Sequence, residues 1–509
     1  MTDSIANKRI AKNTIIIYVR LFTTMFIGLY ASRIVLLTLG ISDFGLYSIV
    51  AGVLTMFTFI SGSLMSATSR FFNVELGKPD GDINRSFNVN FVLHLALAVI
   101  ILILAETIGV WYIYNKLNIE PGKLGDAMFV YQVAIITSCL GLINEPYASL
   151  FHAFERFGFL AKFDVANAII RLVLVILLQY YDGNALRFYC IIMSITTVNA
   201  FIVYHWVAAR DYAYIIKLKF VRGWNNYKEV VFFSNWNLLA TVAMMARTTG
   251  SDLIINSFFG TAVNGTFAVS KTVNNYVMSF SSNFDSASGP QIIQAFSAGD
   301  NDRCNYIVNK LGRLSLLLFE LVFFSLFIEL DFILHLWLKK VPDGVLLFCQ
   351  LNLLLAAVSL TCGGLMQLIS ASGKIKWFKI VGGIISFVSI LSGYLLYKNG
   401  APAYTMIIIF IVADAVNRII QLALLKLIVG FNSLRYAREA YLRPFIIALI
   451  MSIFLYIYSL LEVDNMLLKI VAIMGSFGIT SALVFSIGLT RGEKYKLLSF
   501  VKNKIRVLL

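Results

Sequence analysis

The chain has 509 residues, of which 59% are hydrophobic and only 14% are charged, and its formal net charge is +15. The interior of a soluble fold of this length cannot hide so many apolar side chains, so the composition excludes a soluble protein and predicts that lipid covers the remainder. The Lys and Arg residues lie mainly in short breaks between apolar runs rather than in one basic patch, which argues against nucleic acid as a partner.

Residues 1–12 are polar and lead into an apolar run that is too long for a signal-peptide core, so we expect a retained first span. A spanning helix needs about 20 apolar residues, and runs of that length recur along the chain. We predict an all-α integral membrane protein with about 14 transmembrane helices. The spans are expected at 13–39, 43–69, 86–112, 127–151, 157–180, 185–208, 230–256, 262–287, 307–336, 344–371, 377–397, 402–428, 440–461 and 466–489.

The breaks between these spans differ in positive charge. With the N-terminus inside, 29 Lys and Arg residues fall on the cytoplasmic side and 7 on the other side. Because cytoplasmic loops carry an excess of Lys and Arg, we predict that both termini are cytoplasmic and that the number of spans is even.

An internal repeat organises the chain. The segment GISDFGLYSIV from Gly40 matches GTAVNGTFAVS from Gly260, and GKPDGDINRSFNVN from Gly77 matches SAGDNDRCNYIVNK from Ser297, both at the same offset in the sequence. Six spans per repeat predict two parallel six-helix lobes around a central cavity. The predicted divisions are an N-terminal lobe at 1–209, a cytoplasmic linker at 210–229, a C-terminal lobe at 230–430, and two additional helices with a basic tail at 431–509.

Polar residues on one face of the eighth span are the best candidates for a cavity lining. Lys271, Asn274, Asn275, Ser282 and Asp285 recur at helical spacing, and such a face cannot contact lipid. Thr55 and Thr58 lie in the repeat-related second span. Hydrogen bonding between helices is the alternative role for the small polar residues.

Charged residues in the first and seventh spans add further candidates. Arg247 is expected in the cavity, and Arg20 is expected either there or at the membrane interface, which its long side chain could reach. Arg33 and Asp252 lie at similar depth once the repeats are aligned, so we predict a cross-lobe ion pair.

Several acidic residues lie within spans. Asp252, Asp285 and Glu145 are candidate ion-coupling groups, and Asp414 and Arg418 form a predicted i, i+4 pair. The five Cys and four His residues are scattered without metal-binding spacing, so we expect no metal site, disulfide framework or cofactor.

The opening segment NTIIIYVRLFTTMFIGLYASRIVLL, the AFER element at residues 153–156 and the 6+6+2 layout resemble the polysaccharide transporter and O-antigen flippase branch of the multidrug/oligosaccharidyl-lipid/polysaccharide (MOP) superfamily. The resemblance covers nearly the whole chain. It implies a V of two lobes around a cationic cavity, alternating access, and transfer of undecaprenyl-diphosphate-linked oligosaccharides across a bacterial inner membrane. We also expect a monomer that works beside other polysaccharide-assembly proteins.

Three alternatives stay open. A multidrug or organic-cation antiporter of the same superfamily would need acidic groups in its cavity, and the first span contains none. A lipid II flippase of the same superfamily is a further alternative, and the sequence does not exclude it. A membrane polysaccharide polymerase, the enzyme alternative, would need a long external loop, whereas the longest external break is residues 114–126.

Overall fold

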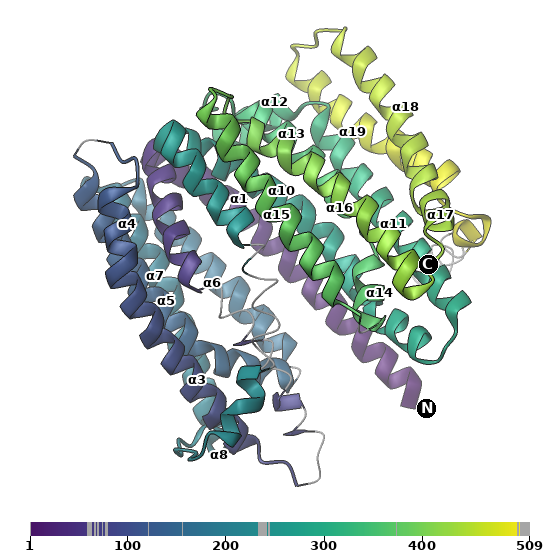
Figure 1. Ribbon diagram of the computed structural model, residues 1–509. Helices are drawn as coiled ribbons and strands as arrows, with labels where there is room; N and C mark the ends of the chain where they lie inside the picture. The colour runs from purple at the N-terminus through teal and green to yellow at the C-terminus, as the bar shows by residue number, and fades with distance from the viewer. Residues whose placement is uncertain are drawn as a thin grey trace, which may run out of the picture. The chain divides into compact units, whose positions relative to one another are not determined.

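The computed structural model describes residues 2–58, 80–120, 122–154, 156–232, 245–372 and 374–495, together with residues 64, 65, 68, 71–73, 75, 76, 242 and 498. Side chains are described in these stretches except at 2–19, 21, 55–58, 280–291, 293, 294, 297 and 370. All secondary structure in this part of the chain is helical, which confirms the predicted all-α class (Figure 1). Nine of the described helical segments are long and apolar enough to cross a membrane.

Contacts between residues group the chain into two compact units. Unit 1 comprises Met1–Ala268, Trp337–Pro342 and Tyr397–Asn399, and unit 2 comprises Val269–Leu336, Asp343–Leu396 and Gly400–Leu509. The main boundary lies inside one helix of the second repeat. The lobes predicted at 1–209 and 230–430 therefore differ from these contact units, and they stay a prediction.

Unit 1 is built mainly from five long helical segments. α3 continues through a π-helical turn, so the predicted span 86–112 is observed as three consecutive segments. α3, α5 and α7 run side by side (Figure 1), and α6 packs on α1. The segments are α1 (Thr2–Thr58), α3 (Ile83–Leu104) with η1 (Ala105–Gly109) and α4 (Val110–Asn115), α5 (Leu124–Ala153), α6 (Phe157–Leu178), α7 (Ala185–Asp211), the short α8 (Ala213–Ile216), η2 (Ala246–Gly250) and the first part of α10 (Ser251–Ser297).

Unit 2 contains the rest of α10 and most of the later helices. α11 packs against α13, α18 and α19, and α13 packs against α16. The predicted span 344–371 is observed as two helices because Gly364 takes a positive φ of 74° between them. The helices are α11 (Asn301–Phe327), α12 (Leu330–Leu338), α13 (Val345–Leu360), α14 (Leu365–Ser372), α15 (Lys376–Lys398), α16 (Thr405–Val429), α17 (Ser433–Tyr436), η3 (Ala437–Tyr441), α18 (Leu442–Ser459), α19 (Met466–Leu483) and η4 (Val484–Gly488).

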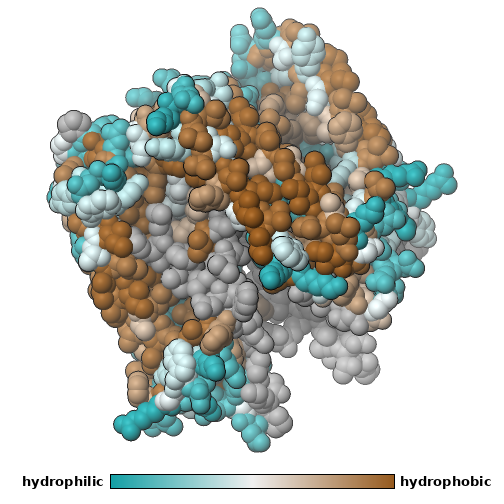
Figure 2. All heavy atoms as spheres, in the orientation of Figure 1, coloured by the Kyte–Doolittle hydropathy of each residue, from teal (hydrophilic) through white to brown (hydrophobic). Residues whose placement is uncertain are grey.

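Large apolar side chains point away from the protein along the outer helices. Phe387 on α15 is 66% exposed, Phe445 on α18 is 66% exposed, and Met474 on α19 is 70% exposed. On the visible face, hydrophobic residues cover helix flanks and hydrophilic residues gather toward helix ends (Figure 2). Exposure of such surfaces to water is unfavourable, whereas lipid tails solvate them. These flanks therefore fit the interior of a bilayer.

The repeat is visible in the backbone of unit 1. Gly40 (φ 75°, ψ 173°) bends α1, and Gly260 (φ 78°, ψ −173°), its partner in the predicted repeat, bends α10 in the same way. This conformation is essentially restricted to glycine because a Cβ atom would clash with the backbone. The predicted spans 13–39 and 43–69 are therefore joined at a sharp corner, and the first spans of the second repeat are joined at an equivalent corner.

The helices that follow the two corners cross closely. An ideal Cβ atom on Gly45 would lie 2.0 Å from the backbone oxygen of Thr261, and one on Gly265 would lie 2.4 Å from the backbone oxygen of Ile41. Gly45 and Gly265 are partners in the predicted repeat, and so are Ile41 and Thr261. The contact is therefore reciprocal, as expected where two repeat copies meet across an approximate twofold axis.

Equivalent N-caps mark the next helix of each repeat. The Asp82 carboxylate accepts a hydrogen bond from the backbone N–H of Arg85 at 2.9 Å, and the Asp300 carboxylate accepts one from Arg303 at 3.0 Å. Each cap satisfies a backbone donor that the first turn leaves open. The predicted offset matches Asp82 with Asp302, whereas the equivalent N-cap is Asp300. The predicted alignment is therefore wrong by two residues at this position.

The predicted linker at 210–229 belongs to unit 1, and its residues in and just after α8 contact α3. The Asn84 side chain donates to the backbone oxygens of Ile215 at 2.7 Å and Lys217 at 2.8 Å. Asn88 accepts from the backbone N–H of Lys219 at 2.8 Å. Two asparagines of α3 therefore satisfy backbone groups at the end of α8 and at Lys217 and Lys219, which lie outside any helix.

Candidate functional site

Polar contacts join the two glycine corners of unit 1. The Ser42 hydroxyl lies 3.1 Å from that of Thr261, and Ser42 also donates to Glu120. The Asn256 side chain accepts from the backbone N–H of Asn118 at 3.1 Å. The 116–123 loop, predicted to be external, therefore ties one repeat copy to the other at this end of unit 1.

An ion pair strengthens the same end. The Lys123 ammonium lies 3.0 Å from the Asp43 carboxylate. This hydrogen bond and the negative charge raise the pKa of Lys123 above its ordinary value, against a lowering by burial. Lys123 therefore keeps its charge at any physiological pH, and the link does not depend on proton concentration.

Arg20, a candidate for the cavity, pairs with an acid of unit 1. Its guanidinium lies 2.6 Å from the Asp164 carboxylate of α6. The Arg20 side chain is 40% exposed and that of Asp164 is 27% exposed, so solvent or a ligand can still reach the pair. A paired arginine offers less net charge to an anion than an isolated one, although its remaining N–H donors stay available.

The predicted Arg33–Asp252 pair is not among the ion pairs of the described residues. Both side chains are half-buried, and both belong to unit 1. The pair stays a prediction.

Arg247 is half-buried in η2, a π-helical turn of the kind that often occurs at functional sites. Thr55 and Thr58 lie in the last turn of α1, but their side chains lie outside the described residues.

The polar face of α10 enters unit 2. Lys271 and Asn274 are half-buried, whereas Asn275 is exposed. The Asn274 carbonyl oxygen is buried and accepts no hydrogen bond from the described residues, so it is free to accept one from a ligand or water. Ser282 and Asp285 lie on the same helix, but their side chains lie outside the described residues.

A neighbouring residue of α10 has a structural role. The fully buried Ser270 hydroxyl accepts a hydrogen bond of 2.8 Å from Asn352 of α13. This bond fixes α10 against α13 and places Lys271, the next residue, beside a rigid contact. Ser270 therefore serves helix packing, and it is not one of the residues predicted to line a cavity.

Glu145, a candidate coupling group, is half-buried in α5. It precedes Pro146, which lies inside the helix and is buried. The neighbouring Asn144 carbonyl oxygen is also buried without a partner among the described residues. A proline removes one backbone donor from the helix and leaves a carbonyl open. This part of α5 therefore offers several acceptors to a proton or cation.

The predicted pairing of Asp414 with Arg418 is replaced by bonds to another helix. The Arg418 guanidinium donates to the Thr361 hydroxyl at 3.0 Å and to the Ser359 backbone oxygen at 3.2 Å, while the Ser359 hydroxyl donates to Asp414 at 2.7 Å. The sequence spacing placed the two charges one turn apart. It could not show that the end of α13 supplies a partner for each of them.

Two further features concern ligand binding. No group of three or more His, Cys, Asp or Glu side chains that could share a metal ion occurs in the part of the chain that the structure describes. Unit 2 also contains a pocket of about 480 Å³ that sequence reasoning missed. In the sequence analysis, the cations of this pocket contributed only to the prediction of topology. They are Lys310, Arg313, Arg435, Arg438 and Arg443.

No family model and no curated protein matches the sequence. Among solved structures, a multidrug resistance MATE family transporter of the MOP superfamily in an inward-facing conformation matches with a TM-score of 0.62 and 14% identity, over 80% of this chain and 96% of that one. The lipid II flippase MurJ in an inward closed conformation matches with a TM-score of 0.62 and 13% identity, over 93% and 99%. The MATE multidrug transporter DinF-BH matches with a TM-score of 0.59 and 16% identity, over 86% and 97%.

These matches span nearly the full length of the known structures, at low identity. The chain therefore has the fold of the MOP superfamily transporters. Together with the nine candidate spans in the described residues, this fold makes the chain a multi-pass membrane protein.

Proposed function

We propose that the chain is a transporter of the MOP superfamily that moves undecaprenyl-diphosphate-linked oligosaccharides from the cytoplasmic to the periplasmic leaflet by alternating access. The shared fold supports the class of protein. The resemblance of the opening segment and the AFER element supports the substrate.

The observation that carries this proposal is the polar face of α10. Lys271 is a half-buried cation on a membrane-crossing helix, and Asn274 beside it presents a buried oxygen without a partner among the described residues. Cations within spans are costly and serve where an ion or an aqueous path needs them. A diphosphate supplies the opposite charge, and a glycan supplies hydroxyl donors for an amide oxygen.

Charge at Lys271 provides the test. Lys271→Gln should lower the initial rate of glycan translocation in proteoliposomes on the order of tenfold or more, because a hydrogen bond to a charged group contributes about 1.5–3 kcal/mol. Lys271→Arg should retain activity. Lys379→Gln, at an exposed residue of unit 2, is the matched control for loss of one positive charge. Normal translocation by Lys271→Gln at equal protein abundance would assign the polar face to helix packing.

Two alternatives have support from the matched structures, which include MATE multidrug transporters and a lipid II flippase. An antiporter for organic cations would use acids rather than Lys271. Loss of cationic-dye export in Asp252→Asn or Asp285→Asn, with Lys271→Gln active, would favour that function. Competition between lipid II and other lipid-linked glycans in the same vesicles separates the two flippases.

A further inference from the structure

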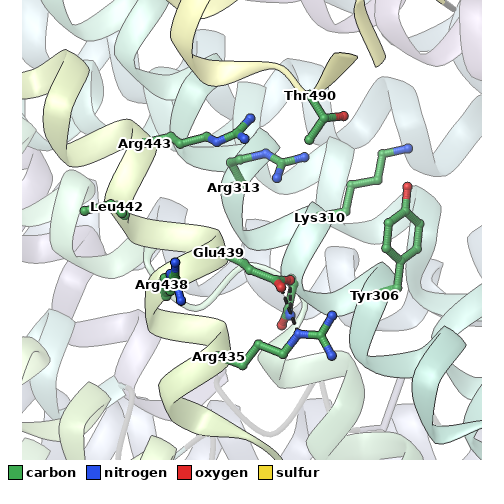
Figure 3. A pocket seen from close by; sticks show the side chains of 10 residues that line it. Tyr306, Lys310, Arg313, Arg435, Arg438, Glu439, Leu442, Arg443 and Thr490 are labelled. Atoms are coloured by element: carbon green, nitrogen blue, oxygen red, sulfur yellow. Dashed lines mark hydrogen bonds and ion pairs between the residues drawn. The ribbon is translucent and has the colours of Figure 1, made fainter. Parts of the chain in front are cut away.

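A pocket of about 480 Å³ lies in unit 2 where α11 meets the chain that leads from α17 into α18 (Figure 3). Lys310 and Arg313 come from α11, and Arg435, Arg438 and Arg443 come from α17, η3 and α18. Glu439 is the one carboxylate among the described lining residues. We call this site the basic pocket.

The basic pocket has a rigid frame. Glu439 accepts hydrogen bonds from Asn309 at 2.7 Å and from Arg435 at 2.8 Å, which are drawn in Figure 3. The Arg313 side chain is only 9% exposed, and its guanidinium donates to both carboxylate oxygens of Glu493 at 2.7 and 2.9 Å. Residues of α11, η3 and the segment after α19 are therefore held in place before any ligand arrives.

The pocket also has unused binding capacity. Arg313 Nε is buried and has no hydrogen-bond partner among the described residues. Among the described residues, no carboxylate lies within 4.0 Å of the charged groups of Lys310 or Arg438. In this part of the chain, Glu439 and Glu493 form ion pairs with two of the five cations, Arg435 and Arg313, and Asp302 acts on Arg435 at longer range. Gathering like charges is unfavourable, so this arrangement is suited to an anion that offsets their repulsion.

An apolar track leads away from the pocket along α18. Leu442 lines the pocket and is 49% exposed, and Phe445 and Leu449 are 66% and 54% exposed. Their spacing of three and four residues places them on one face of the helix. Charges at one end and exposed apolar groups beyond them match the two parts of a lipid.

We propose that the basic pocket binds the phosphate headgroup of an anionic phospholipid whose acyl chains lie along Leu442, Phe445 and Leu449. Guanidinium groups bind phosphate oxygens through paired hydrogen bonds, and basic pockets between membrane helices bind lipid headgroups. The remaining excess of positive charge fits one phosphodiester or the two phosphodiesters of cardiolipin. The site is separate from Lys271, and the inference does not depend on the transported substrate.

Binding to the full-length protein in neutral detergent tests this site. Native mass spectrometry would measure the affinity for phosphatidylglycerol and for cardiolipin, with phosphatidylcholine as the neutral lipid and inorganic phosphate as the soluble anion. Lys310→Gln and Arg438→Gln remove cations that bond to no carboxylate in the described residues, so folding should be retained. Arg303→Gln removes an exposed cation of α11 outside the pocket and is the matched control.

We expect each pocket variant to weaken anionic-lipid binding about fivefold, and the double variant about 25-fold, with Arg303→Gln unchanged. Phe445→Ser should weaken binding of the lipids but not of inorganic phosphate. Equal affinity for phosphatidylcholine, or unchanged affinity in the double variant, would overturn the proposal. Displacement of the lipid by an equal concentration of inorganic phosphate would also overturn it, because the site would then recognise a soluble anion.

Discussion

At the scale of single residues, the contact between Arg313 and Glu493 joins the C-terminal segment to α11. The two side chains are only 9% and 11% exposed, and the carboxylate also accepts a hydrogen bond from the backbone N–H of Thr490 at 2.8 Å. A buried pair of this kind contributes little relative to apolar residues, but loss of one partner leaves the other charge buried and alone.

The first prediction concerns removal of that charge. Glu493→Gln should lower the apparent melting temperature in detergent, since an uncompensated buried arginine costs about 3–5 kcal/mol. Glu462→Gln, at an exposed residue, should melt like the unmodified protein. If both variants melt alike, Arg313 does not need Glu493 for stability.

The same pair has a predictable pH dependence. Burial alone would raise the pKa of Glu493, but hydrogen bonds from Thr490 and the charges of Arg313 and Lys310 outweigh burial and lower it below the ordinary value of 4.5. A carboxyl with a lowered folded-state pKa adds stability above its ordinary pKa, and that stability is lost as the pH falls through the folded-state pKa. The difference in melting temperature between Glu493→Gln and the unmodified protein should therefore shrink only in acid, below about pH 4.5.

At the scale of elements, the reciprocal crossing of the two repeats depends on the size of two residues. A methyl group at Gly45 or Gly265 would meet backbone atoms of the other copy, which cannot move aside as a side chain can. The helices would have to separate. A close approach of helices through small residues is a common way to pack them in a membrane.

We expect Gly45→Ala and Gly265→Ala each to reduce transport and thermal stability, because either change displaces the same contact. Gly475→Ala is the control, since a Cβ atom there meets no atom within 4 Å. Because both glycines act on one crossing, the double variant should cost less than the sum of the two single changes. Strict additivity would show that the two contacts are independent.

Most elements followed from hydrophobic runs in the sequence, whereas contacts between elements did not. The spans predicted at 185–208 and 402–428 correspond to α7 (Ala185–Asp211) and α16 (Thr405–Val429), because runs of this length have few alternatives in a membrane. The break within 344–371 depends on one glycine conformation, which hydropathy does not report. Arg20 was recognised from the sequence as a charged group within a span, but its pairing with Asp164 depends on the contact of α1 with α6.

The candidate site was only partly predictable for the same reason. The spacing of Lys271 and Asn274 on one helix follows from the helical period, and the structure describes both as half-buried. The basic pocket instead combines Arg313 with Arg438 and Arg443, which lie several helices further along the chain. No periodicity links such positions, so their shared location required the fold.

At the scale of the whole molecule, the distribution of positive charge should decide orientation in the membrane. The basic pocket and the docked segment at Lys217 and Lys219 both lie on the side predicted to be cytoplasmic. The linked corners at Lys123 and Asp43 lie on the side predicted to be external. Positive loops are retained inside during insertion, which makes these assignments testable in cells.

The last prediction is therefore topological. Reporters fused after Lys219, Lys376 and Leu509 should read cytoplasmic, and reporters near Lys123 and Lys340 should read external, because 29 Lys and Arg residues lie on one predicted side and 7 on the other. Single-cysteine labelling in the full-length chain would check the fusions. An external reading at Lys219 would mean an odd number of spans in the first repeat. The two repeats would then be inverted rather than parallel, and the predicted six-helix lobes would be wrong.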